Sequence, residues 1–227
     1  MIVVQFLSVV AVGYLIGSIP FGVIIGRRFI KEDIRGYGSG KTGATNVLRA
    51  AGKKAAALVL FLDAAKGALA VVVAAVIVGR NYLVINDFGL GLLAAQCLAA
   101  LAAMAGHNWS VFLKFKGGRG VATFFGGLVA LSPVVALFGS EVFIIGVGLT
   151  RFASLGSIAG AVGAYTVLIP LTLLGGFPLE YLVYTLIGTI VIIIMHHDNI
   201  GRLLMGRERK LGEKAEPIDS PSEDSNE

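Results

Sequence analysis

Charged residues and cysteine are scarce in this chain of 227 residues, and each scarcity excludes a class of protein. Only 15% of the residues are charged and 56% are hydrophobic, whereas soluble domains carry roughly a quarter charged residues. The one cysteine, Cys97, lies in an apolar run, which excludes an intramolecular disulfide and a zinc cluster of cysteines. The composition disfavours a soluble enzyme, a disulfide scaffold and a disordered chain, and it predicts an all-α, polytopic integral membrane protein.

Long apolar runs predict the membrane-spanning helices, and they cover residues 2–25, 55–78, 88–106, 121–150, 155–174 and 179–195. A signal peptide is the alternative for the first run, but no basic residue precedes it and Gly17-Ser18-Ile19-Pro20 interrupts it. The fourth run would extend about 45 Å as one helix, beyond the roughly 30 Å of a hydrocarbon core. Because it contains Ser132-Pro133, we expect a break there and seven spans in all.

The lysines and arginines predict how these spans are oriented. With seven spans, 17 of the 19 lysines and arginines lie on one face, in groups of eight, three, one and five along the chain. Arg80 lies on the other face, and Lys66 lies within a span. A single span over residues 121–150 would instead divide them 11 to 7. The positive-inside rule therefore predicts seven transmembrane helices with the N-terminus outside and the C-terminus in the cytoplasm.

The net charge of +5 conceals two differently charged parts of the chain. Residues 213–227 hold six acids against one lysine, which leaves a net charge of +10 on residues 1–212. We therefore divide the chain into a polytopic transmembrane domain, residues 1–212, and an acidic tail, residues 213–227, whose Ser and Pro content is typical of disorder. The positive excess must face anionic lipid head groups or anionic substrates.

Polar and glycine-rich residues gather in four stretches on the predicted cytoplasmic side, at residues 36–49, 107–123, 151–157 and 196–202. The first contains Gly-Lys-Thr, but Arg35 stands where an ATP-binding P-loop requires glycine. The runs 43–46 and 116–120 still resemble phosphate cradles. The first leads from Gly43 toward the basic Arg49, and the second combines three glycines with Lys116 and Arg119 ahead of a predicted helix. Tight turns and lipid anchors are the alternative for either loop by itself.

Several polar residues outside these loops have simple structural interpretations. Asp63 and Lys66 lie three apart on one predicted span, which is typical of an intrahelical ion pair, with substrate contact by Lys66 as the alternative. His107 is placed to cap the end of a helix. His196 and His197 lack further ligands at metal-binding spacing, so we expect no metal.

The chain also lacks the usual signatures of a catalytic nucleophile. It has no Gly-x-Ser-x-Gly elbow, no aspartate at the His-x4-Asp spacing after any of its three histidines, and no cation in sequence beside Cys97. An anion-binding site of this kind suits a reaction whose substrate is already activated, in which positioning and charge neutralisation supply most of the rate.

Four motifs together resemble the bacterial glycerol-3-phosphate acyltransferases that use acyl phosphate as donor, the PlsY type. They are the runs 39–49, 115–123, 154–157 and 196–200, in family order within residues 1–212. The resemblance implies a multi-pass enzyme of the bacterial inner membrane with a cytoplasmic active site. It would transfer a fatty acyl group from acyl phosphate to the 1-hydroxyl of sn-glycerol 3-phosphate, giving lysophosphatidic acid and inorganic phosphate, the first acylation step of phospholipid biosynthesis. Neither a cofactor, a nucleic acid nor an obligatory protein partner is implied; the partners are the two substrates and the lipid bilayer.

The resemblance also assigns roles to residues that match the family motifs. Implied as catalytic are Ser154, His196 and Asn199; as glycerol 3-phosphate ligands, Ser39, Arg49 and Lys116; and as acyl phosphate ligands, Gly43, Thr45, Asn46, Gly117, Gly118, Arg119 and Gly120. Two departures stand out, because family members commonly have Asn-Pro at Lys41-Thr42 and lysine at Arg119. We hypothesise direct attack by the glycerol hydroxyl, with either His196 or a substrate phosphate accepting the proton.

A transporter of a phosphorylated or other anionic metabolite is the alternative function. It predicts polar residues near the middle of the bilayer and access from both faces. Here the polar stretches lie on one predicted face, and the chain has no internal repeat. A structural membrane subunit is a third interpretation, but it leaves both glycine-rich loops unexplained.

Overall fold

Nine α-helices make up most of the part of the chain that the computed structural model describes, residues 1–85, 88–215 and 217–218. They are α1 (Ile2–Ser18), α2 (Phe21–Ile30), α3 (Ala44–Val78), α4 (Leu92–Asn108), α5 (Val121–Leu131), α6 (Pro133–Thr150), α7 (Ala153–Leu173), α8 (Leu179–Met195) and α9 (His197–Leu204). Between α3 and α4, β1 (Leu83–Ile85) and β2 (Phe88–Leu90) pair antiparallel with Val84 opposite Gly89. Short 3-10 turns cover Ile34–Gly36 and Val111–Leu113.

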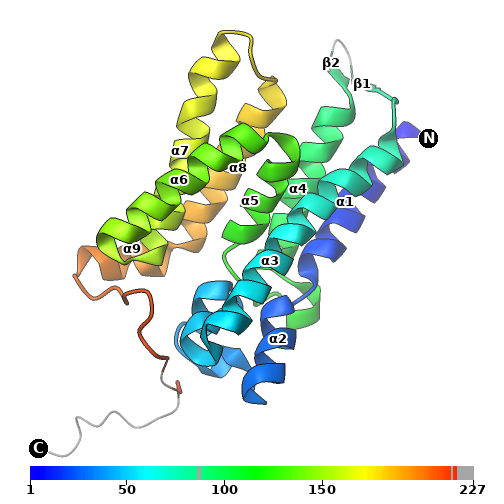
Figure 1. Ribbon diagram of the computed structural model, residues 1–227. Helices are drawn as coiled ribbons and strands as arrows, with labels where there is room; N and C mark the ends of the chain where they lie inside the picture. Colours follow the sequence, from blue (N-terminus) through cyan, green and yellow to red (C-terminus); the bar gives the residue numbers. More distant parts are fainter. Residues whose placement is uncertain (86–87, 216, 219–227) are drawn as a thin grey trace, which may run out of the picture.

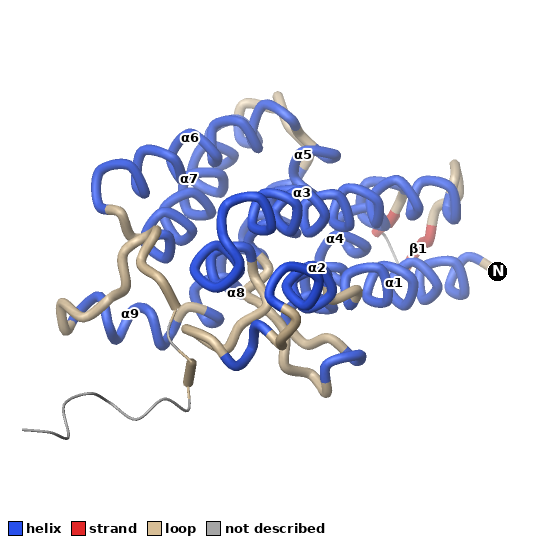
Figure 2. Tube along the Cα trace, turned by 60° about the horizontal axis from the view of Figure 1, so that its bottom comes forward, coloured by secondary structure: helices blue, strands red, loops and turns tan. Residues whose placement is uncertain are grey.

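The helices form an elongated bundle in which α5 lies centrally. It packs against α3, α4, α6 and α8, while α1 packs on α3 and α4, and α7 packs on α6 and α8. Figures 1 and 2 show α6, α7 and α9 on one side of the molecule and α1 and α2 on the other, with α3 between them. In Figure 1 the N-terminus, the β1–β2 pair and the α7–α8 turn lie at one end of the bundle, and α2 and α9 lie at the opposite end.

Length and composition qualify four segments among the described residues as membrane spans: Ile2–Ile30, Ala44–Val78, Pro133–Thr150 and Ala153–Leu173. A fifth is added if α8 and α9, which are bent by 61° at His196, form one broken span. The 17 residues of α4 and the 11 residues of α5 fall short of that test. The 11 residues of α5 rise about 16 Å, less than a hydrocarbon core. Seven crossings therefore stay a prediction.

Three backbone breaks divide the helices of the bundle. The break expected at Ser132-Pro133 is present, because α5 ends at Leu131 and Pro133 opens α6, where its missing N–H is tolerated. Figure 1 shows α6 returning toward the end of the bundle from which α5 starts. Pro20 similarly separates α1 from α2. A third break, not predicted from the sequence, is Gly52 at φ 85°, so residues 44–51 form a short helical segment of their own within α3.

Small residues allow α1 and α4 to approach closely. A Cβ added to Gly17 would lie 1.9 Å from the carbonyl oxygen of Ala103, and one added to Gly106 would lie 2.1 Å from that of Tyr14. Further along the bundle, Phe124 of α5 stacks on Tyr184 of α8, whose hydroxyl donates to the Phe124 carbonyl at 2.7 Å. These contacts hold α4 against α1 and α5 against α8.

Candidate functional site

A cavity of about 390 Å³ opens between α3, α5, α6, α7 and the segment that follows α9. One part of its wall is polar and includes Ser39, Thr45, Arg49, Asp63, His107, Arg119, Ser154, Ser157, His196, Asn199 and Glu208. The other part is apolar and includes Leu60, Ala64, Val121, Phe125, Phe143 and Ile144. A ligand that carries both a negatively charged group and an aliphatic chain matches this division.

Three helices begin at the wall of this cavity. The first residues of α3, α5 and α7, namely Ala44, Val121 and Ala153, all line it. The first amides of a helix have no intrahelical acceptor, and the helix dipole places partial positive charge there. Because the three termini converge on one space, the backbone itself favours an anion such as phosphate.

Arginine side chains add full positive charge to the same wall. Burial and the neighbouring Arg202 lower the pKa of Arg119 to about 10, so its guanidinium stays charged near neutral pH. The Nε atoms of Arg49 and Arg119 are buried and have no hydrogen-bond partner within the described residues. Each arginine therefore retains an unused donor.

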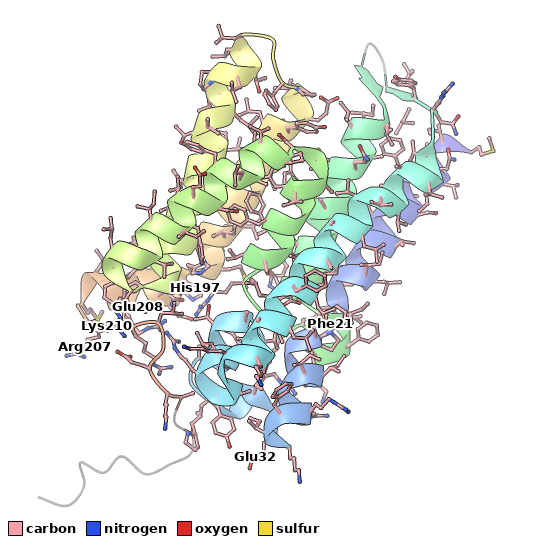
Figure 3. The ribbon with its side chains drawn as sticks, viewed as in Figure 1. Phe21, Glu32, His197, Arg207, Glu208 and Lys210 are labelled. Atoms are coloured by element: carbon pink, nitrogen blue, oxygen red, sulfur yellow. The ribbon has the colours of Figure 1, made fainter. Side chains whose placement is uncertain are left out.

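Two of the three implied catalytic residues, Ser154 and Asn199, are joined by an acid that was not predicted from the sequence. The Ser154 hydroxyl and the Asn199 amide donate to Oε1 of Glu208 at 2.8 and 2.6 Å, and Arg202 donates to Oε2 at 2.8 Å. Burial opposes the charge on Glu208, but these hydrogen bonds outweigh it and lower the pKa of the carboxyl. Figure 3 shows Glu208 on the segment leading from α9 toward the C-terminal tail.

His196 is held as the tautomer that leaves Nε2 free to accept a proton. Its Nδ1 lies 2.7 Å from the carbonyl oxygen of Ile192, and because a carbonyl only accepts, Nδ1 carries the hydrogen. Burial and the charge of Arg119 lower the pKa of His196 to about 4, so the ring is neutral at physiological pH. The adjacent His197 is exposed, pairs with Asp198 at 3.0 Å and does not line the cavity.

The geometry gives Asn46 a different role from the phosphate contact implied by the sequence. Its Oδ1 accepts from the Ser39 amide at 3.0 Å, and its Nδ2 lies within 3.0 Å of the carbonyl oxygens of Ile34, Tyr37 and Lys41. The side-chain amide is thus fully occupied by the backbone of the preceding loop. Asn46 therefore shapes that loop and places Ser39 at the cavity wall.

The second glycine-rich loop also uses its first amides within the protein. Gly117 donates to the carbonyl of Asn108 at 3.1 Å, and Gly118 donates to that of His107 at 3.0 Å. Since these amides are occupied, they do not present the free donors expected of a phosphate cradle. The Lys116 side chain is exposed. These interactions shape the loop, whose following residues reach the cavity.

Ten of the residues predicted for the site line the cavity: Ser39, Gly43, Thr45, Asn46, Arg49, Arg119, Gly120, Ser154, His196 and Asn199. Lys116, Gly117 and Gly118 do not. Glu208, Asp63 and His107, which were not predicted as site residues, do. The available sequence signal for Glu208 was its position as a lone acid between Arg207 and Arg209, in a run that was interpreted only as a topology signal.

The segment that follows α9 is hydrogen-bonded to Arg49 and Arg151 beside the cavity. Arg49 donates to the carbonyls of Arg209 and Lys210 at 3.1 and 3.4 Å. The Leu211 amide donates to the Arg151 carbonyl at 2.7 Å, and Ala215 donates to the Arg49 carbonyl at 3.2 Å. The start of the predicted acidic tail thus contacts the helical domain, while residues 216 and 219–227 lie outside the described residues. The boundary at residue 212 stays a prediction.

An apolar helical bundle whose cavity has a cationic wall beside an apolar wall defines a class of membrane protein with a site suited to amphipathic anions. The family model described as glycerol-3-phosphate acyltransferase matches residues 7–206, and the chain belongs to this family. The chain is 61% identical over 215 residues to glycerol-3-phosphate acyltransferase 3 of Dehalococcoides mccartyi strain CBDB1, covering 95% of this chain and all of that relative. It is 43% identical over 206 residues to the glycerol-3-phosphate acyltransferase of Neisseria meningitidis serogroup C, serotype 2a, covering 90% and 96%.

Two solved structures share the fold. Both are crystal structures of PlsY (YgiH), an integral membrane glycerol 3-phosphate acyltransferase. The glycerol 3-phosphate form aligns with a TM-score of 0.78 and 39% identity over 91% of this chain and 96% of that one. The lysophosphatidic acid form aligns with a TM-score of 0.76 and 38% identity over 90% and 94%. The resemblance to the PlsY type is confirmed, and with it the all-helical integral membrane fold.

Proposed function

We propose that this chain is an acyl-phosphate-dependent glycerol-3-phosphate acyltransferase. It transfers a fatty acyl group to the 1-hydroxyl of sn-glycerol 3-phosphate and releases lysophosphatidic acid and inorganic phosphate. The observation that carries the proposal is the divided cavity, in which three helix N-termini and Arg49 and Arg119 adjoin an apolar wall. Both substrates carry phosphate and one carries an aliphatic chain, so both kinds of wall are required.

In this proposal, the reaction is a single displacement at the acyl carbonyl carbon. The glycerol hydroxyl oxygen forms the new ester bond, and the bond from the acyl carbon to the phosphate oxygen breaks. Arg119 and the start of α5 neutralise the charge on the departing phosphate. Nε2 of His196 or a substrate phosphate accepts the hydroxyl proton, while Ser154 and Asn199 orient the hydroxyl. Because phosphate is a good leaving group, no covalent acyl-enzyme is needed.

The substrate assignments follow the same geometry. Ser39, Arg49 and Lys116 are proposed for glycerol 3-phosphate, and Lys116 requires its exposed side chain to swing toward the cavity. Gly43, Thr45, Arg119 and Gly120 are proposed for acyl phosphate, with Asn46, Gly117 and Gly118 shaping the two loops. Glu208 accepts hydrogen bonds from Ser154 and Asn199 and so fixes the positions of these two side chains relative to each other.

The proposed topology has seven crossings in the bacterial inner membrane. The N-terminus, the β1–β2 pair and the α7–α8 turn lie at the outer end, and the cavity and C-terminus lie on the cytoplasmic side. The first three of these features lie together at one end of the bundle (Figure 1), which supports this arrangement. So does the gathering of 17 of the 19 lysines and arginines in the segments assigned to the cytoplasmic side. Residues 1–212 are the proposed catalytic domain, and residues 213–227 the proposed tail.

The test is phosphate release from synthetic acyl phosphate by the purified protein, with and without glycerol 3-phosphate. Acyl transfer predicts release that depends on the acceptor and matches the lysophosphatidic acid formed. A transporter of anionic metabolites predicts no such release, together with counterflow of labelled substrate in vesicles. The second result would overturn the proposed function.

A further inference from the structure

Three ionisable side chains form a buried cluster beside the cavity that the acyl-transfer chemistry does not use. The Lys66 ammonium lies 2.8 Å from Oδ1 of Asp63, one turn earlier on α3, which confirms the expected ion pair. Nδ1 of His107, at the end of α4, lies 3.4 Å from the same oxygen. Asp63, Lys66 and His107 are only 1%, 3% and 6% exposed. Charged groups buried this deeply are costly and are expected to have a function when they persist at membrane depth.

On one side, the cluster is anchored to the junction between α1 and α2. The Lys66 ammonium donates to the Ile19 carbonyl at 3.1 Å and lies 5.8 Å from the centre of the Phe21 ring. Figure 3 shows Phe21 at the start of α2, beside α3. Lys66 therefore fixes the Asp63 carboxylate from the side away from the cavity.

On the other side, the cluster supports the second glycine-rich loop. The His107 carbonyl accepts the Gly118 amide at 3.0 Å, and a Cβ added to Gly118 would lie 2.1 Å from Nε2 of the same histidine. The loop backbone therefore lies directly on the imidazole ring. The next residues, Arg119 and Gly120, line the cavity and lead into α5.

We propose that Asp63 and His107 are positioning residues for the acyl phosphate site. The Asp63 carboxylate fixes the imidazole, and the imidazole sets the position of the loop backbone at Gly118. That position places Arg119 and the first amides of α5 against the donor phosphate. Misplacement of a binding group by about 1 Å can reduce the rate by about 100-fold. The inference rests on the proposed function, since it assigns the loop to the acyl phosphate donor.

A matched pair of double variants separates positioning from folding. Both carry Lys66→Met, which removes the buried cation, and they differ at residue 63. Asp63→Asn keeps an oxygen facing Nδ1 of His107, whereas Asp63→Leu keeps the branched shape in a bulkier side chain and has no acceptor. For each detergent-solubilised variant, calorimetry measures the Kd of an acyl phosphonate, a non-hydrolysable donor analogue, and kinetics give the KM of each substrate.

We expect the Asn variant to keep the Kd of the unmodified protein within about threefold and the Leu variant to bind the phosphonate about tenfold more weakly, the order expected for the loss of one hydrogen bond to the phosphate. The KM for glycerol 3-phosphate stays the same in both. Equal phosphonate affinities in the two variants, or equal losses for both substrates, would overturn the positioning role. Failure of the unmodified protein to bind the phosphonate or turn over the substrates would instead count against the proposed function.

Gly118→Ala tests the same role with the ion pair intact. The added methyl group collides with His107, so the loop must shift, and phosphonate affinity should fall at least fivefold while the KM for glycerol 3-phosphate is retained. Gly36→Ala is the control on the other loop, since a Cβ there meets open space and Gly36 does not line the cavity. Unchanged phosphonate affinity in Gly118→Ala would contradict support of the loop by His107, even if both double variants failed to fold.

Discussion

The tautomer of His196 follows from a single backbone carbonyl. Ile192 fixes the hydrogen on Nδ1, while burial and Arg119 disfavour a second proton. At the residue scale, the site therefore keeps a neutral imidazole next to cations. An imidazolium would lose the one acceptor that the ring offers to a hydroxyl.

We predict that the His196 ring titrates with a pKa of about 4, against an ordinary value of 6.5. Nitrogen-15 NMR of labelled histidine measures it, with His197→Gln to simplify the spectrum. The activity that depends on the free Nε2 should persist at pH 5 and fall as the pH approaches 4.

The lowered pKa of His196 also makes the free energy of unfolding depend on pH. Because the folded-state pKa lies below the unfolded value, the unfolded chain binds more protons between those two values. Stability is then lost as the pH falls from about 6.5 to about 4. Arg119→Gln should raise the pKa of His196 but leave it below 6.5, since burial remains. A pKa of 6.5 or above in the unmodified protein would contradict this account of the ring.

Arg49→Ala is predicted to raise the KM for glycerol 3-phosphate by about 10- to 100-fold. The change removes hydrogen bonds from a charged donor, each worth about 1.5–3 kcal/mol. It also releases the carbonyls of Arg209 and Lys210, so the segment after α9 should become more sensitive to protease. Arg49→Lys keeps the charge without the forked geometry and should give an intermediate KM. An unchanged KM in steady-state kinetics on Arg49→Ala would exclude Arg49 from the acceptor site.

The location of residues at the cavity was predictable where a motif carried them, and not where it depended on a distant partner. Ser154, His196 and Asn199 were assigned from their motifs and do line one cavity. Glu208 was missed because nothing in its local sequence indicates that it bonds to Ser154, 54 positions earlier. Gly118 was expected to lie against phosphate, whereas its missing side chain makes room for His107.

At the scale of elements, the site depends on where helices begin. Gly120, at φ 77°, precedes α5, and Gly52, at φ 85°, ends the short segment that carries Arg49. The break at Ser132-Pro133 was predictable because proline acts locally. The one at Gly52 was not, because glycine is also tolerated inside a helix and only packing selects the broken form.

Close packing of α1 on α4 gives a prediction for stability. Gly17→Ala places a methyl group 1.9 Å from the Ala103 carbonyl oxygen, so the helices must separate, at a cost of about 1–3 kcal/mol. Gly148→Ala on α6 is the control, because a Cβ there meets open space. Thermal unfolding in detergent should show a lower Tm for Gly17→Ala and no loss for Gly148→Ala. Equal Tm values would argue against this packing.

At the scale of the whole molecule, composition predicted an all-helical membrane protein, while the number of crossings depends on charge counting. Three exposed positions distinguish the alternatives: Lys53, Asn81 and Leu174. In a Cys97→Ala background, each is changed to cysteine in turn and labelled with an impermeant thiol reagent in intact cells.

Seven crossings predict external labelling at Asn81→Cys and Leu174→Cys and protection at Lys53→Cys. Permeabilised cells serve as the control, because all three sites should then react. A single crossing over residues 121–150 instead places Leu174→Cys on the same side as Lys53→Cys. Protection of Leu174→Cys in intact cells, together with labelling of Asn81→Cys, would therefore contradict seven crossings.

The central claim is that one cavity positions two phosphorylated substrates for direct acyl transfer without an enzyme nucleophile. Intact-mass spectrometry of the purified protein, first with acyl phosphate alone and then after addition of glycerol 3-phosphate, tests it most directly. We predict an unmodified chain mass at both stages and one lysophosphatidic acid formed per phosphate released. A chain heavier by one acyl group with the donor alone, which loses that group when the acceptor is added, would contradict the account.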